Sequence, residues 1–85
     1  MTKNQVVAFL RCPSAQIVDV AIAIANLTEK EEAAIRLCGQ HAMTQEAAAE
    51  KLECSTNGLQ RWYYSGMEKL IQAWTGVWWI EKLAK

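Results

Sequence analysis

The sequence lacks the features that mark several large classes of protein. Its longest apolar run, Val20 to Ala25, falls far short of the roughly 20 residues that a helix needs to cross a bilayer. The amino terminus has no basic region followed by a continuous apolar segment, so no secretory signal is expected. Three cysteines without paired spacing favour free thiols over a disulfide framework. These absences predict a cytoplasmic protein that does not associate with membranes.

An excess of charge of one sign is also missing. The 85 residues carry 9 Lys and Arg against 9 Asp and Glu, for a formal net charge of +0. Within residues 27–70, five cations face seven anions, which gives −2. A strongly basic coat for nucleic acid is therefore excluded, because such surfaces carry clustered Lys and Arg.

Patterns for catalysis or metal binding are scarce. The chain has 1 His, His41, and no glycine-rich phosphate loop or nucleophile–base pair is visible. Cys38 and His41 are three residues apart, but the cysteines form no C-x-x-C pair of the kind that holds zinc. We therefore expect no enzyme, no cofactor and no metal site.

The residues that are present predict an all-α protein. Hydrophobic residues make up 52 % of the chain and recur every three or four positions, as they do along one face of a helix. At this length we expect one domain spanning residues 1–85. About five helices are expected: N-terminal helices within 3–26, a core over 27–70 and a Trp-rich C-terminal extension over 71–85.

Capping residues mark the helix starts. Thr2 and Thr28 each precede a Gln or Glu three residues on, which is the pattern of a capping box. The fifth helix is expected to run nearly to the chain end, with Thr75-Gly76 as the place for a break. Side-chain oxygens placed to cap the second, fourth and fifth helices belong to Ser14, Thr44 and Ser55.

The second helix, expected over Ala15 to Asn26, is apolar on more than one side. Its core stripe is predicted to hold Ile17, Val20, Ala21 and Ile24. The alternation over residues 18–25 also permits a strand, but no other segment looks like a strand that would pair with it.

The stretch from Gln45 to Tyr64 predicts two helices around a tight turn. Counted from Gln45, a helix-turn-helix needs a small residue at its fifth position, where the helices cross, and Ala49 lies there. The ninth position needs a left-handed backbone, and Glu53 occupies it at a cost of about 1 kcal/mol against Gly. The apolar residues that pin the helices together are Leu52, Cys54, Leu59 and Trp62.

The wider segment from Leu27 to Leu70 resembles region four of bacterial sigma factors without a gap. Its opening, Leu27-Thr28-Glu29-Lys30-Glu31, is similar to the family's "L-T/P-x-x-E". Met43 to Glu46 match "L-S/T-x-E", Leu52 to Ser55 match "L-G-V-S", and Lys69-Leu70 match the closing "K-L". The LuxR-type helix-turn-helix is also similar, but its linker is typically one residue shorter. The resemblance implies a small regulator of phage or mobile-element type that binds double-stranded DNA.

The predicted DNA contacts follow from this resemblance and from the helical period. The start of the fifth helix would enter the major groove, where the family's base-reading positions fall on Thr56, Asn57 and Arg61. Arg61 suits guanine, and Asn57 or Gln60 suits adenine. Phosphate contacts are expected from the start of the fourth helix. The complete predicted set is Thr44, Gln45, Ser55, Thr56, Asn57, Gln60, Arg61 and Tyr64.

An alternative is that these polar residues are merely solvated, on a module that serves protein interaction or assembly. A polymerase-binding adaptor or a protein similar to a phage terminase small subunit would fit that description. The chain is also too short for a complete sigma factor. RNA polymerase, another protein or a second copy of the chain therefore remain possible partners beside DNA.

Three tryptophans follow the segment that resembles the sigma family: Trp74, Trp78 and Trp79. Such large aromatic side chains either bury much area or form contact surfaces. One interpretation packs Trp74 and Trp78 on the first two helices. The other makes Trp74, Trp78 and Trp79 an interface for a partner or a homodimer.

Overall fold

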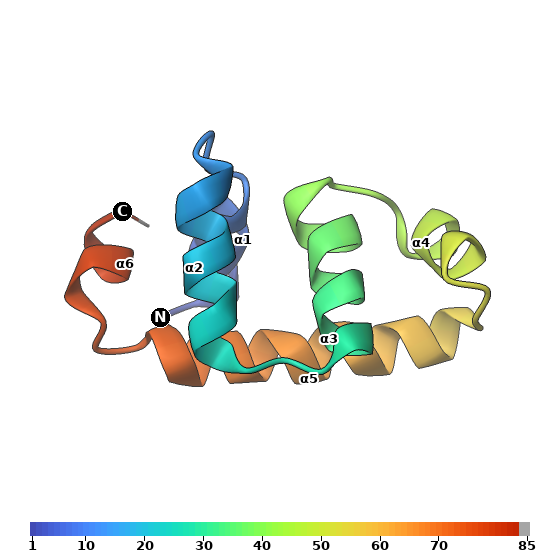
Figure 1. Ribbon diagram of the computed structural model, residues 1–85. Helices are drawn as coiled ribbons and strands as arrows, with labels where there is room; N and C mark the ends of the chain where they lie inside the picture. The colour runs from blue at the N-terminus through green and yellow to red at the C-terminus, as the bar shows by residue number, and fades with distance from the viewer. Residues whose placement is uncertain (84–85) are drawn as a thin grey trace.

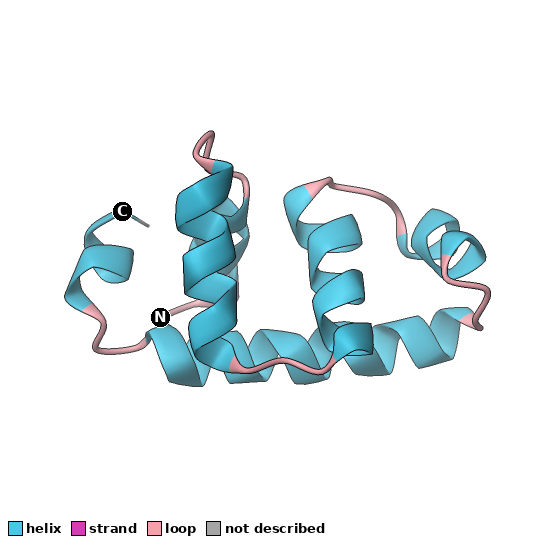
Figure 2. Cartoon of the chain, in the orientation of Figure 1, coloured by secondary structure: helices cyan, strands magenta, loops and turns pink. Residues whose placement is uncertain are grey.

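The computed structural model describes residues 1–83, which contain helices and no strand (Figures 1 and 2). The prediction of an all-α protein is therefore confirmed. None of the helices in this part of the chain is long and apolar enough to span a membrane. The helices are α1 (Lys3–Leu10), α2 (Ala15–Ala25), α3 (Glu29–Ala34), α4 (Gln45–Lys51), α5 (Thr56–Trp74) and α6 (Trp78–Leu83), and α3 continues into a π-helical segment, η1 (Ile35–Gln40).

Side-chain caps begin most of the helices as the sequence predicts. The hydroxyls of Thr2 and Thr28 accept a backbone N–H three residues on, and the Gln5 and Glu31 side chains complete both capping boxes. Thr44 and Ser55 cap α4 and α5 in the same way. Ser14, by contrast, makes no capping hydrogen bond to α2.

The chain has one helix more than the expected five among its described residues. Helix α5 ends at Trp74, and α6 begins at Trp78. Between them Gly76 adopts a φ of 89°, a left-handed conformation that a helix cannot continue through. The break falls at Thr75-Gly76, where the sequence favoured it, and it makes the Trp-rich extension a separate helix.

Helix α5 runs beneath the other helices along much of the molecule, whose principal extents are 36 × 22 × 19 Å (Figure 1). α1 and α2 cover the C-terminal half of α5, and α3 and α4 stand over its N-terminal half. η1 approaches α5 closely at Gly66, where a Cβ would lie 2.8 Å from the Ile35 side chain. Because α5 touches both halves, it holds the N-terminal helices and the α3–α4 pair in one fixed arrangement.

Two clusters of buried side chains form the core. The smaller one lies between α3, α4 and α5 and comprises Ala34, Ala48, Ala49 and Leu59. Ala49, the predicted small residue of the helix crossing, is buried there. The larger cluster joins α1, α2, η1, α5 and α6, and it consists of Val6, Phe9, Leu10, Val18, Ala21, Ile22, Ile35, Met67, Leu70, Trp74 and Ile80.

The core face of α2 differs from the predicted one. Of the expected stripe only Ala21 is fully buried, whereas Val20 and Ile24 are 56 % and 46 % exposed. Val18 and Ile22 face the core instead. Both sides of α2 are apolar, so its own periodicity does not decide which side faces inward. Packing against α5 decides it.

Candidate nucleic-acid interface

The residues predicted to contact DNA come from two helix starts, those of α4 and α5. Thr44 and Ser55 are exposed, and their hydroxyls accept hydrogen bonds from the backbone N–H groups of Ala47 (3.1 Å) and Gly58 (3.0 Å). Each hydroxyl therefore accepts a hydrogen bond from a backbone N–H in the first turn of its own helix, which fixes where that helix begins.

The turn between these helices has the left-handed backbone that the sequence predicts. Glu53 has a φ of 55°. Its backbone N–H donates to Glu50 O (3.1 Å), and the N–H of Cys54 donates to Ala49 O (3.0 Å). These two bonds form a Schellman motif, which usually has Gly where Glu53 stands. The motif turns the chain sharply enough for α5 to start beside α4.

The outer face of α5 presents three polar side chains. Asn57, Arg61 and Tyr64 are exposed, and their spacing of four and three residues places them on one side of the helix. Leu59 and Gly66 point inward. Thr56 and Gln60 are half-buried at the edge of this face. We call Asn57, Arg61 and Tyr64 the outer face of α5.

One hydrogen bond joins the two helix starts. The Gln60 side-chain Nε2 donates to Gln45 Oε1 over 2.7 Å. This bond ties the first residue of α4 to the second turn of α5. It leaves the side-chain carbonyl oxygen of Gln60 and the side-chain amide NH2 of Gln45 available to a ligand. Six of the eight predicted residues thus belong to the same two helix starts, and Arg61 and Tyr64 extend the surface along α5.

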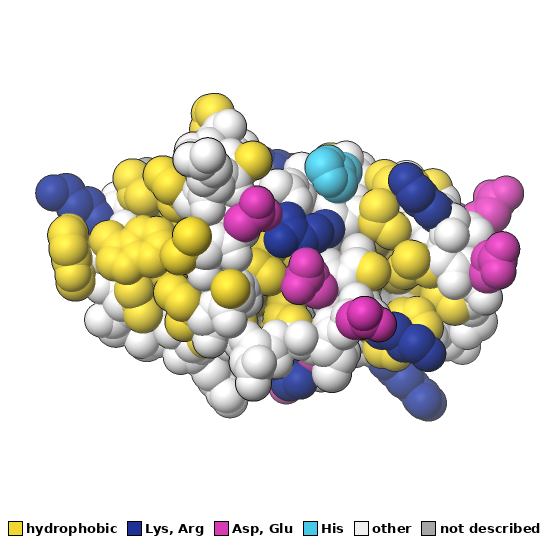
Figure 3. Space-filling model, viewed as in Figure 1, with side chains coloured by type: hydrophobic (Ala, Val, Ile, Leu, Met, Phe, Trp, Pro, Cys, Tyr) yellow, Lys and Arg dark blue, Asp and Glu magenta, His cyan; other side chains and the backbone are white. Residues whose placement is uncertain are grey.

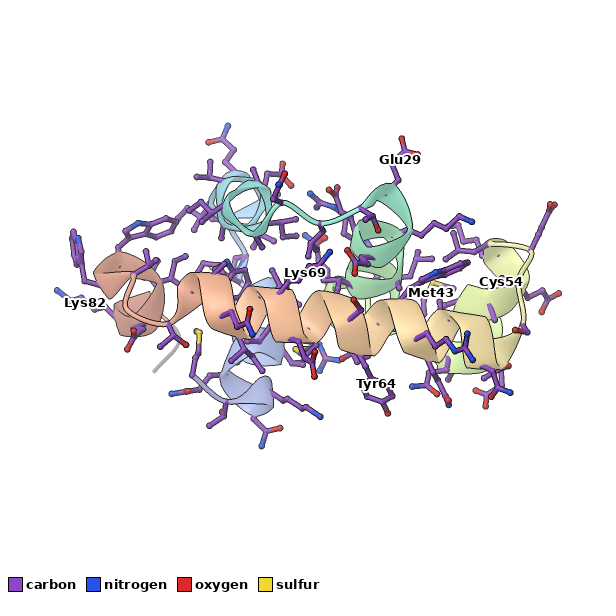
Figure 4. The ribbon with its side chains drawn as sticks, turned by 90° about the horizontal axis from the view of Figure 1, so that it is seen from below. Glu29, Met43, Cys54, Tyr64, Lys69 and Lys82 are labelled. Atoms are coloured by element: carbon purple, nitrogen blue, oxygen red, sulfur yellow. The ribbon has the colours of Figure 1, made fainter. Side chains whose placement is uncertain are left out.

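Lys3 is part of this surface, which was not predicted from the sequence. Its Nζ lies 5.3 Å from the ring centroid of Tyr64, and the Tyr64 ring packs edge-on against Tyr63 at 5.8 Å. Tyr64 projects from one side of α5 and Lys69 from the other (Figure 4). α1 therefore adds a positive charge on the Tyr64 side. No local pattern signals a contact between residues so far apart in the chain.

Ion pairs engage some of the charged side chains of residues 27–70. Arg36 bonds to Asp19 (2.9 Å) and Glu32 (3.0 Å), and Lys69 bonds to Glu31 (2.7 Å). Arg61 takes part in no ion pair within residues 1–83, so its guanidinium is available to a partner. Exposed acids remain on α4, on the turn and on α5: Glu46, Glu50, Glu53 and Glu68.

Glu31 anchors α3 to α5 behind this surface. The whole residue is only 5 % exposed. One carboxylate oxygen accepts from Lys69 Nζ and from the Thr28 backbone N–H, and the other accepts from the Ser65 hydroxyl. The hydrogen bonds from Lys69 and Ser65 lower the pKa of Glu31 from 4.5 to about 2. The carboxylate is thus charged at neutral pH and holds the two helices together.

A surface pocket lies between α3 and the α4–α5 turn. Two residues that line the pocket contact each other: Lys30 Nζ lies 4.9 Å from the ring centroid of Trp62. Glu29 and Tyr64 lie on opposite sides of α5 in Figure 4. The pocket therefore does not belong to the outer face of α5. It is lined by Glu29, Lys30, Ala33, Leu52, Glu53, Cys54 and Trp62.

The three C-terminal tryptophans have different environments. Trp74 is fully buried; its indole Nε1 donates to Ala21 O (2.8 Å), and its ring meets Phe9 edge-on at 5.0 Å. The expectation that Trp74 forms part of an interface is therefore wrong, because the helices cover it. Trp79 is half-buried, 6.4 Å from the Phe9 ring. Trp78 is 73 % exposed, so it does not pack in the core.

No protein-family model matches this sequence, and no curated protein or solved structure matches it significantly. Within residues 1–83, no three His, Cys, Asp or Glu side chains lie close enough together to hold a metal ion. The chemistry of the outer face of α5 and of the two helix starts is therefore the basis for a functional assignment.

Proposed function

We propose that this protein is a small DNA-binding transcription regulator in which α4, the turn and α5 act as a helix-turn-helix. The observation that carries the proposal is the placement of the polar residues. The starts of α4 and α5 are joined by the Gln45–Gln60 bond, and the exposed Asn57, Arg61 and Tyr64 share the outer face of α5. A helix that presents such side chains from its first turns suits the major groove.

Each side chain has a role that fits its chemistry. Arg61 donates two hydrogen bonds to the O6 and N7 acceptors of guanine, and Asn57 pairs with the N6 and N7 edge of adenine. Gln60 lies at the edge of the outer face of α5 and assists Asn57. Thr44 and Gln45 lie close to a phosphate and set the register, and Lys3 adds a cation beside Tyr64.

The second candidate is a protein-interaction or assembly module, such as a polymerase-binding adaptor or a protein similar to a terminase small subunit. The exposed Trp78 and the acids around α4 favour it, because both are unusual on a surface devoted to DNA. RNA polymerase or another protein would be the partner. The two candidates differ in the expected effect of replacing Arg61: only the first predicts a loss of DNA binding.

Selection from a random duplex pool at low salt, followed by sequencing, tests the proposal. We expect the protein to enrich one motif and Arg61→Ala to weaken binding to that motif about 5- to 150-fold, the effect of losing one bidentate base contact. Lys30→Ala is the matched control, because it removes the same charge from an exposed residue of α3 that lines the surface pocket and does not belong to the outer face of α5.

Unchanged binding by Arg61→Ala, with helix content retained in circular dichroism, would contradict the groove-reading role. Absence of any retained duplex at low salt would favour the protein-interaction candidate.

A further inference from the structure

Exposed hydrophobic side chains gather on α2 and α6. Four large ones are exposed by about half or more: Val20, Ile24, Trp78 and Leu83, the last of them by 52 %. In the space-filling view, hydrophobic side chains run together across the part of the molecule formed by these two helices (Figure 3). We call these four residues the α2–α6 patch.

We propose that the α2–α6 patch is the interface of a homodimer, in which a second copy of this chain covers it. The spacing of apolar residues along α2 suits contact with a second copy. Ile17, Val20 and Ile24 follow at three and four residues, which is the stripe that one helix presents to another. In a two-fold dimer the same stripe meets itself, so an apolar face is its own complement.

The charge of the patch also favours a second copy of the chain over a charged partner. The four side chains of the patch are uncharged, and Asp19 beside them is neutralised by Arg36 at 2.9 Å. Glu81 and Lys82, the exposed charged residues of α6, have opposite signs, so the surface carries no net charge that would select a strongly charged partner, such as nucleic acid or an acidic peptide. Two copies do not repel each other over long range either, because the formal net charge of the chain is +0.

The exposed apolar area of the α2–α6 patch is small for a stable dimer. The four side chains expose on the order of 400 Å², the size of the largest apolar patches on monomeric proteins. A standard interface takes about 800 Å² from each partner. The patch would therefore form the apolar centre, with polar residues of α2 and α6 as its rim. An interface of this size predicts a weak dimer that dissociates on dilution.

Dimerisation leaves the outer face of α5 free. α2 lies on one side of α5, and Tyr64 projects from the other (Figure 4). The dimer therefore presents two copies of that face, but the inference does not depend on what the face binds.

Sedimentation equilibrium of the full chain between about 1 µM and 1 mM tests this inference over the range expected for weak interfaces. We expect the mass to rise from 9.6 kDa toward twice that value as concentration increases. Val20→Glu and Trp78→Ala should each keep the chain monomeric, because the first places like charges face to face and the second removes the largest apolar contact. Gln72→Glu is the matched control: it adds the same charge at an exposed position on α5 and should dimerise like the wild type.

A mass of 9.6 kDa at every concentration would overturn the inference. So would a dimer that forms equally well in both patch variants, since it would use another surface. Circular dichroism establishes that each variant is folded. Val20 and Trp78 are both exposed, so their replacement should leave the helix content unchanged.

Discussion

Glu31 illustrates at the scale of a single residue why acids in this chain do not all oppose DNA binding. Its carboxylate closes the capping box of α3 and also reaches Lys69 and Ser65 on α5. One of the seven acids counted in residues 27–70 is therefore buried and paired, and so contributes little to the surface potential. The same contacts hold α3 against α5.

This arrangement predicts that stability depends on pH through Glu31. Its pKa in the folded protein, about 2, lies below the ordinary 4.5, so its contribution is complete above pH 4.5 and is lost as the pH falls toward 2. Glu31→Gln should lower the free energy of unfolding by about 2 kcal/mol at neutral pH, because hydrogen bonds to a charged group are lost. Urea unfolding between pH 2 and pH 7 measures this difference.

The difference between wild type and Glu31→Gln should shrink as the pH approaches 2. Glu68→Gln provides the control, since Glu68 is an exposed carboxylate on α5, the helix that Glu31 contacts from α3. A constant difference at all pH values would show that the side-chain shape of Glu31 matters and its charge does not.

Single residues also mark where sequence reasoning succeeds and where it ends. The left-handed Glu53 was predictable, because the helix-turn-helix spacing assigns that conformation to one position whatever residue occupies it. The contact of Lys3 with Tyr64 was not predictable. It depends on how α1 folds back over α5, and no local pattern encodes that path.

At the scale of whole helices, α5 organises the molecule. Its N-terminal half carries Leu59 into the smaller core cluster, and its C-terminal half carries Leu70 and Trp74 into the larger one. Gly66, between them, allows the close approach of η1. The helix that presents the proposed reading surface is therefore held along its whole length, which favours a preformed surface.

Comparison of two tryptophans tests this description. Trp74→Ala should lower the free energy of unfolding by about 3–5 kcal/mol, because it leaves a large cavity beside Phe9 and Ala21. Trp78→Ala, measured at a concentration where the chain is monomeric, should change it by less than about 0.5 kcal/mol, as is usual for exposed positions. Chemical denaturation followed by circular dichroism gives both values. Equal effects would contradict the assignment of Trp74 to the core and Trp78 to the surface.

Helix boundaries were more predictable than helix faces. Caps and breakers act within a few residues, so Thr2, Thr28, Thr44 and Gly76 revealed where helices begin and end. The inward face of α2 depends on tertiary packing, because the helix is apolar on both sides. The inward face of α6 was equally hard to predict: Ile80 faces the core, and Trp78, two residues before it, is exposed.

At the scale of the whole molecule, two kinds of surface lie on different sides of α5. Tyr64 projects from one side of it, and α2 covers the other (Figure 4). A near-neutral protein gains little from general attraction to phosphate, so the proposed DNA contacts would be weak in one copy. Two copies joined through the α2–α6 patch would bind two half-sites together and raise the effective affinity.

The most direct measurement of the central proposal is an NMR titration of ¹⁵N-labelled protein with duplex DNA at low salt. Binding through the outer face of α5 predicts that the amide signals of Asn57, Arg61 and Tyr64 shift. Shifts confined to α2 and α6, or no shifts in α5 even at low salt, would contradict DNA recognition by this face.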